Sequence, residues 1–549
     1  MSEDNLFSPD EERLIDEAFQ HLIESYLQTK HRKKVEIITK AFQFARQAHR
    51  GVRRHSGEPY IMHPLAVAQI VCSEIGLGST SICSALLHDV VEDTDYTTDD
   101  IKNVFGSKIA QIVDGQLHGD GEGIVTSVVI DSRKVQNDSM FAAFPGEKVD
   151  GHDYIGKAFE SGASCCIGNF VPEGETRPMI IVEDVQKALK VLATWYRNTL
   201  TIPVIGITGS VGKTTTKEMV SSVLESRFKV LKTEANLNNE LGVPLTIFRI
   251  EPEHDVAVIE MGISHFQEMT RLAQMAQPDI GIFTVIGYAH LENLGSREGI
   301  LWAKTEMVKY MQPAGVMIVN GDDDLLYKYP AERDKVTYGT ELRCKVRAFG
   351  IEMTEDYTAC TISNGERTLP VRVHAYGNHI IYAALAAVTV GFQFGLSDEE
   401  IQNGLLSYET VGRRANVIHT EKLTLIDDCY NANPGSVKSA LDSMEHFDGR
   451  HVAILGDMFE LGEEENALHE EVGAYAVEHG TDLVLAVGGL SVHTSEGAHK
   501  AGGIAEHFDT KEELLDRLDQ ILMEGDIVLV KASHSMEFEK ISEAIKNQN

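Results

Sequence analysis

A glycine-rich turn between a strand pattern and a helix pattern constrains this chain most. The sequence GITGSVGKTTTKEM at 206–219 ends an apolar run, TIPVIGITG, and opens a helical pattern. In such a loop the glycines let backbone N–H groups approach phosphate oxygens, a lysine adds positive charge, and a hydroxyl can hold Mg²⁺. The residues predicted to bind the phosphates are Gly209, Ser210, Val211, Gly212, Lys213, Thr214 and Thr215. A glycine turn without a ligand is the alternative, because five residues separate Gly206 from Gly212 where the general pattern has four.

The 549 residues predict three to four domains. Residues 1–112 repeat apolar residues at helical spacing, and residues 113–200 alternate short strands with helices. Residues 201–409 form a second α/β pattern around the glycine-rich turn, and residues 410–549 a third. The runs LTLIDD, HVAILGD, DLVLAVGG and DIVLVKAS of the last part predict parallel strands with crossover helices. The fold class is therefore α/β, with an all-helical N-terminal region.

The charge of the chain excludes some partners. Its 84 acidic and 49 basic residues give a net charge of −35, which repels nucleic acid and anionic membranes. Seven cysteines without a CxxC spacing indicate neither a disulfide framework nor a zinc site, and no apolar run is long enough for a membrane span. We expect a cytoplasmic protein that binds no nucleic acid and does not insert into membranes.

Polar residues follow two later strand patterns of the central region. Glu260 ends VAVIEMG, and His290 follows IGIFTVIG, so either side chain could reach a metal ion held by Thr214 and phosphates. Lys304, in LWAKTEM, is predicted at the start of a helix. Taken singly, each has an ordinary alternative as a solvated or structural residue.

Together these segments resemble the Mur ligases. The resemblance runs from about residue 113 to the C-terminus and rests on GITGSVGKTTT, TEANLNNELGVP, VIEMG, IGYAHLENLGS, AKTE, DDCYNANPGS and LGDMFELG. It implies a small UDP-binding domain, a central ATP-binding domain with a mostly parallel sheet, and a C-terminal Rossmann-like domain. YNANP and GDMFELG favour the members that add D-alanyl-D-alanine to UDP-N-acetylmuramoyl-tripeptide, through an acyl phosphate made from ATP. A sister ligase that adds an amino acid or glutamate is the alternative.

The resemblance also implies roles for individual residues. Lys213 and Thr214 would bind the ATP phosphates and Mg²⁺, Glu260 and His290 would serve Mg²⁺, and Lys304 matches a carbamylated lysine. Residues matching those that close over the nucleotide and the incoming dipeptide are Arg413, Asp428, Tyr430, Asn431, Asn433 and the catalytic candidate Lys531. Residues matching those that face the UDP-sugar substrate are Asp131, Ser132, Arg133, Gly146, Asn238 and Asn239.

Four positions depart from the family pattern near the nucleotide. Ile380 and Ala383 stand where the family has asparagines, and Ala532 and His534 stand where KGSR is expected. We therefore expect an active, monomeric ligase with reduced ATP affinity. Because both substrates are anions and the chain carries −35, nucleotide binding should depend strongly on Mg²⁺.

The N-terminal region contains a second resemblance. RHSGEPYIMHP (54–64) and LLHDVVEDT (86–94) resemble the metal-dependent HD hydrolase domain of RelA/SpoT-type alarmone enzymes. The matching residues are Arg54, His63, His88, Asp89, Glu92 and Asp93. The family takes a further aspartate from a later helix, whereas here Mur-like sequence follows FGSKIAQIVDG (105–115). We therefore expect an inactive fragment that does not bind Mn²⁺. A working pyrophosphohydrolase, and an alarmone sensor that regulates the ligase, are the alternatives.

Overall fold

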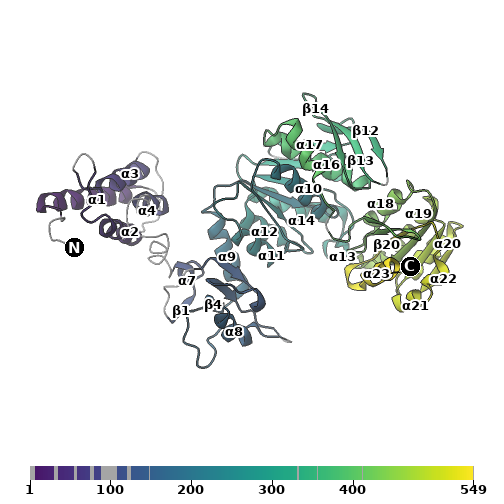
Figure 1. Ribbon diagram of the computed structural model, residues 1–549, viewed down its shortest axis with the longest axis horizontal. Coiled ribbons are helices and arrows are strands. Elements are labelled where there is room, and N and C mark those ends of the chain that lie inside the picture. The colour runs from purple at the N-terminus through teal and green to yellow at the C-terminus, as the bar shows by residue number, and fades with distance from the viewer. Residues whose placement is uncertain are drawn as a thin grey trace. The chain divides into compact units, whose positions relative to one another are not determined.

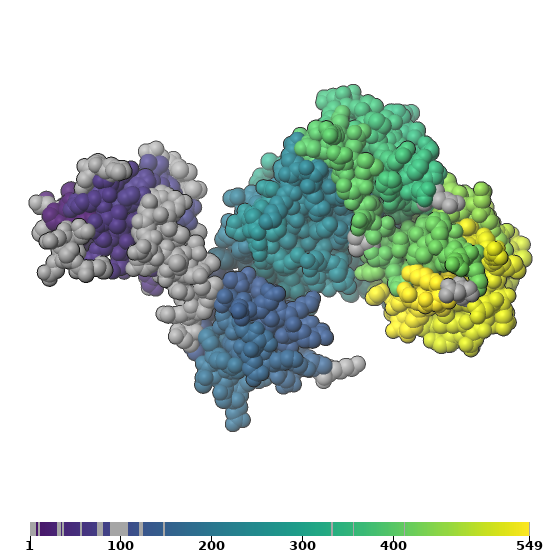
Figure 2. Space-filling view, in the orientation of Figure 1, coloured from purple at the N-terminus to yellow at the C-terminus, as the bar shows by residue number. Residues whose placement is uncertain are grey.

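The chain divides into two units, residues 1–188 and 189–549, and each is described by itself. The computed structural model describes residues 7–29, 35–54, 58–73, 79–87, 108–119, 125–146, 149–330, 333–354, 356–410 and 412–547 (Figure 1). Side chains fill the space between the ribbons of each part (Figure 2).

The first unit begins with four helices, as the apolar spacing predicted. These are α1 (Pro9–Gln28), α2 (Val35–Ala48), α3 (Met62–Ser73) and α4 (Ser79–Leu87). Ser8 and Glu11 form a capping box at the start of α1, and Pro9 occupies its first turn. Buried apolar side chains of the four helices, among them Leu22, Phe42, Leu65 and Leu86, form one core. His88, Asp89, Glu92 and Asp93 lie outside the described residues.

A five-stranded sheet completes the first unit. The strands are β1 (Gln116–His118), β2 (Ser127–Val129), β3 (Ser139–Ala142), β4 (Ala163–Gly168) and β5 (Met179–Ile181), in the order β1-β5-β4-β3-β2. Only β1 is antiparallel to its neighbour. Short helices accompany the strands: α7 (Lys108–Ile112), η2 (Ser132–Lys134), η3 (Gly151–Tyr154) and α8 (Ile155–Glu160), and α9 (Val185–Arg197) leads into the second unit. The strand and helix alternation predicted for residues 113–200 is confirmed.

The second unit contains a nine-stranded sheet with the order β14-β13-β12-β11-β10-β9-β6-β8-β7. Its strands are β6 (Val204–Thr208), β7 (Val230–Lys232), β8 (Val256–Glu260), β9 (Ile280–Phe283), β10 (Val316–Asn320), β11 (Lys335–Gly339), β12 (Val346–Met353), β13 (Thr358–Ser363) and β14 (Thr368–Val373). Strands β6 to β12 run parallel, and β13 and β14 are antiparallel additions. Because β6 lies between β9 and β8, its carboxyl end is where a ligand binds in a sheet of this kind.

Helices cover both faces of this sheet. They are α10 (Lys213–Glu225), α11 (Gly242–Phe248), α12 (Glu268–Ala276), α13 (Leu291–Leu294), α14 (Arg297–Thr305), η4 (Glu306–Tyr310), α15 (Asp324–Lys328), α16 (Asn378–Gln393) and α17 (Asp398–Leu406). Apolar residues of α10 and α16 share one core with the strands, and those of α11, α12 and η4 belong to another. The strand end at residue 208 is thereby held between two packed layers.

The C-terminal part has a six-stranded sheet with the order β15-β16-β20-β17-β18-β19. The strands are β15 (Asn416–His419), β16 (Thr424–Asp427), β17 (Arg450–Gly456), β18 (Leu483–Val487), β19 (Ala505–Phe508) and β20 (Asp526–Lys531). The helices are α18 (Pro434–Met444), η5 (Gly462–Glu464), α19 (Glu465–Glu478), α20 (Val492–Lys500), α21 (Lys511–Leu515), α22 (Leu518–Ile521), η6 (His534–Met536) and α23 (Glu539–Lys546). The four predicted strands are present and parallel.

The seven cysteines are buried. Among the described residues, no helix combines the length and apolar character needed to cross a bilayer.

Candidate active site

The glycine-rich turn connects β6 to α10, as predicted. Gly209 has φ 154°, and a Cβ there would lie 1.8 Å from Thr284 Oγ1, so only glycine fits. Gly212, with φ 81°, precedes α10. Gly206 lies inside β6 and packs near Met261, so the extra residue in the motif's spacing belongs to the strand and not to the loop.

This turn presents free backbone donors. Among the described residues, the N–H groups of residues 211–215 have no hydrogen-bond partner, while Ser210 N–H donates to Val285 O at 2.8 Å. Lys213 Nζ donates to Gly209 O at 2.9 Å, and burial lowers the pKa of Lys213. Successive free N–H groups at a helix N-terminus are suited to an anion, so the loop fits a polyphosphate.

Glu260 joins the loop to the neighbouring strands. Its side chain, at the end of β8, is 2% exposed. Thr214 Oγ1 donates to Glu260 Oε2 at 2.9 Å, and Asn238 Nδ2 donates to Glu260 Oε1 at 2.8 Å. A hydroxyl and a carboxylate beside a phosphate loop are the oxygen donors that Mg²⁺ takes from proteins, so the residues fit this ion.

His290 follows β9 and forms the N-terminal boundary of α13. Its Nδ1 forms a hydrogen bond with Glu460, which lies in the GDMFELG segment of the C-terminal part. Burial and the positive charges of Lys304 and Lys213 lower the pKa of His290, whereas the charge of Glu460 raises it. His290 therefore lies near both lysines, as its predicted role requires.

Lys304 is a buried amine, 1% exposed. Burial and the charge of Lys213 hold its pKa well below the usual range, and Glu268 at the start of α12 opposes this shift. The predicted position at the start of a helix is wrong. Ser296 caps α14, accepting from Gly299 N–H at 3.0 Å, so Lys304 lies in the last turn of that helix.

The C-terminal candidates meet at the carboxyl end of β20. Lys531 Nζ donates to Asp428 Oδ2 at 2.6 Å and to Asn431 O at 3.1 Å. The Arg414 guanidinium lies 3.9 Å from the centre of the Tyr430 ring, with the His534 ring 5.3 Å away on the same tyrosine.

Two further C-terminal candidates already have structural partners. Arg413 Nη1 donates to Asp427 Oδ2 and Nη2 to Glu543 Oε1, both at 2.7 Å. Asn433 caps α18 by accepting from Ser436 N–H at 3.0 Å.

The candidates for the UDP-sugar substrate lie in both units. Asp131 Oδ2 accepts a hydrogen bond from Arg133 Nη2 at 2.8 Å. The intervening residue, Ser132, is buried. A Cβ at Gly146 would lie 2.3 Å from Val149 O. In the second unit Asn239 Oδ1 accepts from Gly242 N–H at 2.9 Å and so orders the start of α11.

Two of the HD candidates are described. Arg54 Nη1 lies 3.5 Å from Glu58 Oε1, and the His63 ring stands edge-on to Tyr60, with 6.1 Å between the ring centres. Arg54 is thus close to an exposed carboxylate in the loop between α2 and α3.

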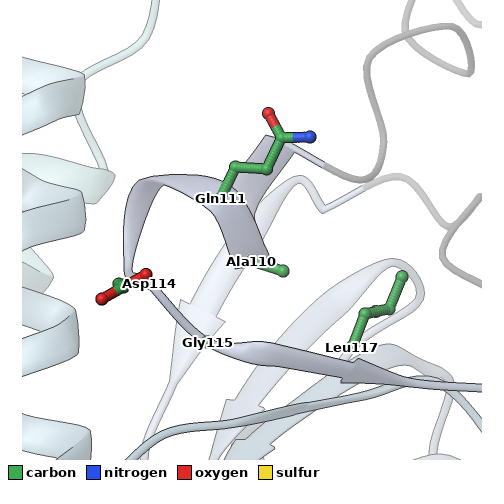
Figure 3. Close-up of a pocket in the computed structure, with 5 residues that line it drawn as sticks. All are labelled: Ala110, Gln111, Asp114, Gly115 and Leu117. Carbon is green, nitrogen blue, oxygen red and sulfur yellow. The ribbon is translucent and has the colours of Figure 1, made fainter.

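One surface hollow lies apart from all these residues. Figure 3 shows it lined by Ala110, Gln111, Asp114, Gly115 and Leu117, with the two polar side chains, Gln111 and Asp114, pointing in different directions. It lacks converging polar groups and carries no chemistry of its own.

Sequence reasoning missed several residues of the site. Four of them contact the candidate residues: Glu460, Arg414, Thr284 and Thr233, whose Oγ1 accepts from Glu260 N–H at 3.0 Å. The fifth, Glu268, acts on Lys304 through its charge. For Glu460 the GDMFELG motif was a signal; the other four have no pattern that marks them.

Family models match most of the chain. Residues 124–197 match the Mur ligase family catalytic domain, 207–391 the Mur ligase middle domain, and 413–534 the Mur ligase glutamate ligase domain. Residues 41–135 match an HD domain, overlapping the first Mur ligase match.

Curated relatives and solved structures agree with these models. The UDP-N-acetylmuramoyl-tripeptide–D-alanyl-D-alanine ligases of Bacillus subtilis and Escherichia coli are 36% and 33% identical, over 79% and 80% of this chain and 96% and 98% of theirs. A crystal structure of MurF from Acinetobacter baumannii is similar at a TM-score of 0.74 and 30% identity, covering 81% of this chain and 98% of that one. The MurF ligase of Thermotoga maritima in complex with ADP gives 0.69 and 29%, covering 77% and 97%.

The chain belongs to the Mur ligase family, with the three-domain α/β fold that the resemblance implied. Within that family its similarity is to the UDP-N-acetylmuramoyl-tripeptide–D-alanyl-D-alanine ligases, and an HD-type segment precedes the ligase part.

Replacing Lys304 with methionine should stabilise the fold. Between the lowered pKa of Lys304 in the folded protein and the usual lysine value of about 10.4, the folded protein binds fewer protons than the unfolded protein. The free energy of unfolding of the wild type should therefore rise with pH between these two values. In CO₂-free buffer at pH 7 we expect Lys304→Met to gain about 1–3 kcal/mol, the usual cost of a buried polar group without a partner. Denaturant unfolding would measure this.

The gain should shrink as the pH approaches 10. The exposed Lys309, on η4, supplies the control: Lys309→Met should match wild type at every pH. A loss of stability in Lys304→Met at pH 7 would contradict the conclusion that burial of the Lys304 amine destabilises the fold.

Proposed function

We propose that the chain is an ATP-dependent, ADP-forming ligase that joins D-alanyl-D-alanine to UDP-N-acetylmuramoyl-tripeptide. The observation that carries the proposal is one connected site: the free N–H groups of residues 211–215, the Thr214–Glu260–Asn238 hydrogen bonds and the buried Lys304. The similarity to ligases named for this reaction supports the choice of substrates.

The reaction makes an amide from a carboxylate and an amine. ATP phosphorylates the tripeptide carboxylate, the dipeptide amine attacks the acyl phosphate, and phosphate leaves. Residues 211–215 and Lys213 bind the phosphate chain and stabilise the charge that develops on the transferred group. Thr214, Glu260 and His290 would hold Mg²⁺, which supplies charge neutralisation when bound.

Asn238 and the C-terminal residues position the reactants. Asn238 is fixed by its hydrogen bond to Glu260, and its remaining amide oxygen would face the muramoyl substrate. Lys531, held by Asp428 and Asn431, places a positive charge at the end of β20, and the Tyr430 ring with Arg414 forms a flat surface for the nucleotide. Positioning is the main contribution that such side chains make to catalysis.

Lys304 would act as a carbamate. An amine whose pKa is lowered by burial gives up its proton more readily, and the free amine can attack CO₂, releasing one proton and leaving a negatively charged carbamate. The anion would lie near the positive charge of Lys213 and beside the Mg²⁺ ligands. The amine has no hydrogen-bond partner among the described residues, which fits a side chain that is completed by modification.

The departures from the family pattern lie around the adenine end of the proposed nucleotide site. Ile380 and Ala383 are 1% exposed and belong to the apolar core of α16, so they offer no hydrogen bond to a base. His534 packs beside Tyr430 in place of the expected arginine. We propose that these changes weaken ATP binding and leave the phosphate chemistry unchanged.

The ligase assay tests the proposed function directly. With UDP-N-acetylmuramoyl-tripeptide, D-alanyl-D-alanine, ATP and Mg²⁺, we expect one ADP and one phosphate for each amide formed, and no ATP binding at the same nucleotide concentration without Mg²⁺. Lys213→Ala should lower kcat by at least about 100-fold, as loss of one transition-state donor does, while Lys309→Ala keeps the wild-type rate.

An amine panel distinguishes the sister ligases. Replacing D-alanyl-D-alanine by D-glutamate or by a single L-amino acid should reduce kcat/KM at least about 100-fold. Equal rates with any of these amines would assign the chain to another branch of the family.

Carbamylation of Lys304 is tested by intact-protein and NMR measurements. With ¹³C-bicarbonate we expect one carbamate carbon signal in the wild type that is absent in Lys304→Met and retained in Lys309→Met. Ligase activity of Lys304→Met should fall at least about 100-fold and recover in part with an added short carboxylic acid, which replaces the missing charge. A wild type without the signal under ligase conditions would remove the carbamate from the proposal.

The HD-type segment gives a second candidate function, because its family model matches residues 41–135. We expect the full chain to release no pyrophosphate from guanosine tetraphosphate with Mn²⁺, and that nucleotide to leave the ligase rate unchanged whether or not residues 1–107 are present. Hydrolysis that disappears in Asp89→Ala would establish a working hydrolase. An effect of the nucleotide that requires residues 1–107 would establish a regulatory segment.

A further inference from the structure

We propose that Glu460 is a positioning residue of the ligase site, which holds the His290 imidazole and ties the C-terminal part of the second unit to that site. The proposal rests on the proposed function, since it assigns His290 to the Mg²⁺ site. It goes beyond that function, because Glu460 lies on a different sheet's loop from all the phosphate and metal ligands.

The contact between the two segments is more than one hydrogen bond. The carboxylate of Glu460 pairs with His290 Nδ1, and the N–H of Glu292 donates to Glu460 O at 3.2 Å. A Cβ at Gly462 would lie 3.3 Å from Glu292 Cα, so the two backbones approach closely. Leu291 and Leu461 are buried in the same apolar core. Residues 290–292 and 460–462, which we call the clasp, therefore bind each other through main chain, side chain and apolar contacts.

Both partners of the hydrogen bond have a strained backbone. His290 has φ 61° and Glu460 has φ 64°, left-handed values that are uncommon for residues other than glycine. Such a conformation is strained and persists where surrounding contacts fix it, most often at functional sites. Two strained residues that meet in one hydrogen bond indicate that this geometry is required.

The charges around His290 explain why a carboxylate is needed. Lys213 places positive charge near the ring, and Glu460 is the carboxylate that faces it. Nε2 of His290 forms no hydrogen bond among the described residues, so it remains available as a ligand while Nδ1 is held. A carboxylate on the far nitrogen fixes the tautomer and orientation of a metal-binding histidine, and its loss usually costs 10–100-fold in metal affinity or activity.

The experiment compares Glu460→Ala, Glu460→Gln and the control Glu463→Ala in the full chain. Glu463 lies three residues further on in η5, is exposed and has no hydrogen bond or ion pair among the described residues. Glutamine keeps the side-chain length and can still bond to imidazole, so it should rescue most of the effect. This rescue separates positioning from a general loss of folding.

The first measurement is the distance between the two sheets of the second unit in nucleotide-free protein. Spin labels at Glu366→Cys and Asp519→Cys report it, and the native cysteines are all buried. We expect Glu460→Ala to lengthen and broaden the distance distribution, and Glu460→Gln and Glu463→Ala to match the wild type. An unchanged distribution in Glu460→Ala would overturn the proposal.

The second measurement is the Mg²⁺ dependence of ligase turnover. Glu460→Ala should raise the half-saturating Mg²⁺ concentration about tenfold or more, with a smaller change in the KM for D-alanyl-D-alanine. An unchanged Mg²⁺ dependence would also overturn the proposal. Absence of turnover in the wild type would overturn the proposed function, while the spin-label distances would still test the clasp.

Discussion

The burial of two lysine side chains near each other determines how this site works. Burial lowers the pKa of both lysines, and the positive charge of Lys213 lowers that of Lys304 further. Charges of this kind are tolerated where anions complete the site. A triphosphate on the loop would supply negative charge beside Lys213, and a carbamate would replace the amine of Lys304 by an anion. A chain with a net charge of −35 can thus bind anionic substrates through a small buried region of opposite sign.

Several strained backbone positions lie around the same site. Gly209 adopts a φ that only glycine tolerates, and His290, Glu460 and Gln267 have left-handed conformations. Gln267 directly precedes Glu268, whose charge acts on Lys304. The strands themselves are regular, and these four positions lie in loops that connect a strand to a helix. The apolar cores on both faces of the sheet stabilise the fold and offset the cost of these strained loop conformations.

Much of the fold could be predicted because local sequence patterns determine most of its strands and helices. Buried parallel strands such as VAVIE and LVLAV are continuous apolar runs, and turns between them contain the glycines and polar residues that pattern reasoning uses. The edge strands β15 and β19 were not predicted, since NVIH and AEHF are half-buried and mix polar with apolar residues. Lys304 was placed at the wrong end of its helix because the cap at Ser296 lies eight residues away from the motif.

The site could be predicted only where one segment supplied its chemistry. The loop at 209–215 was found in this way, and Glu260 through its place at a strand end. Glu460 reaches His290 across 170 residues, and no local pattern reports such a contact.

The boundary near residue 112 is likewise decided by contacts between distant segments and not by the local sequence. The HD family model continues to residue 135, yet residues 116–118 pair with β5 in the sheet of the following domain. A segment that forms this strand cannot continue an HD helix. Asp150, further along the chain, accepts hydrogen bonds from His152 in that domain's loop. Sheet pairing therefore assigns residues 116–118 to the following domain, although the HD family model includes them.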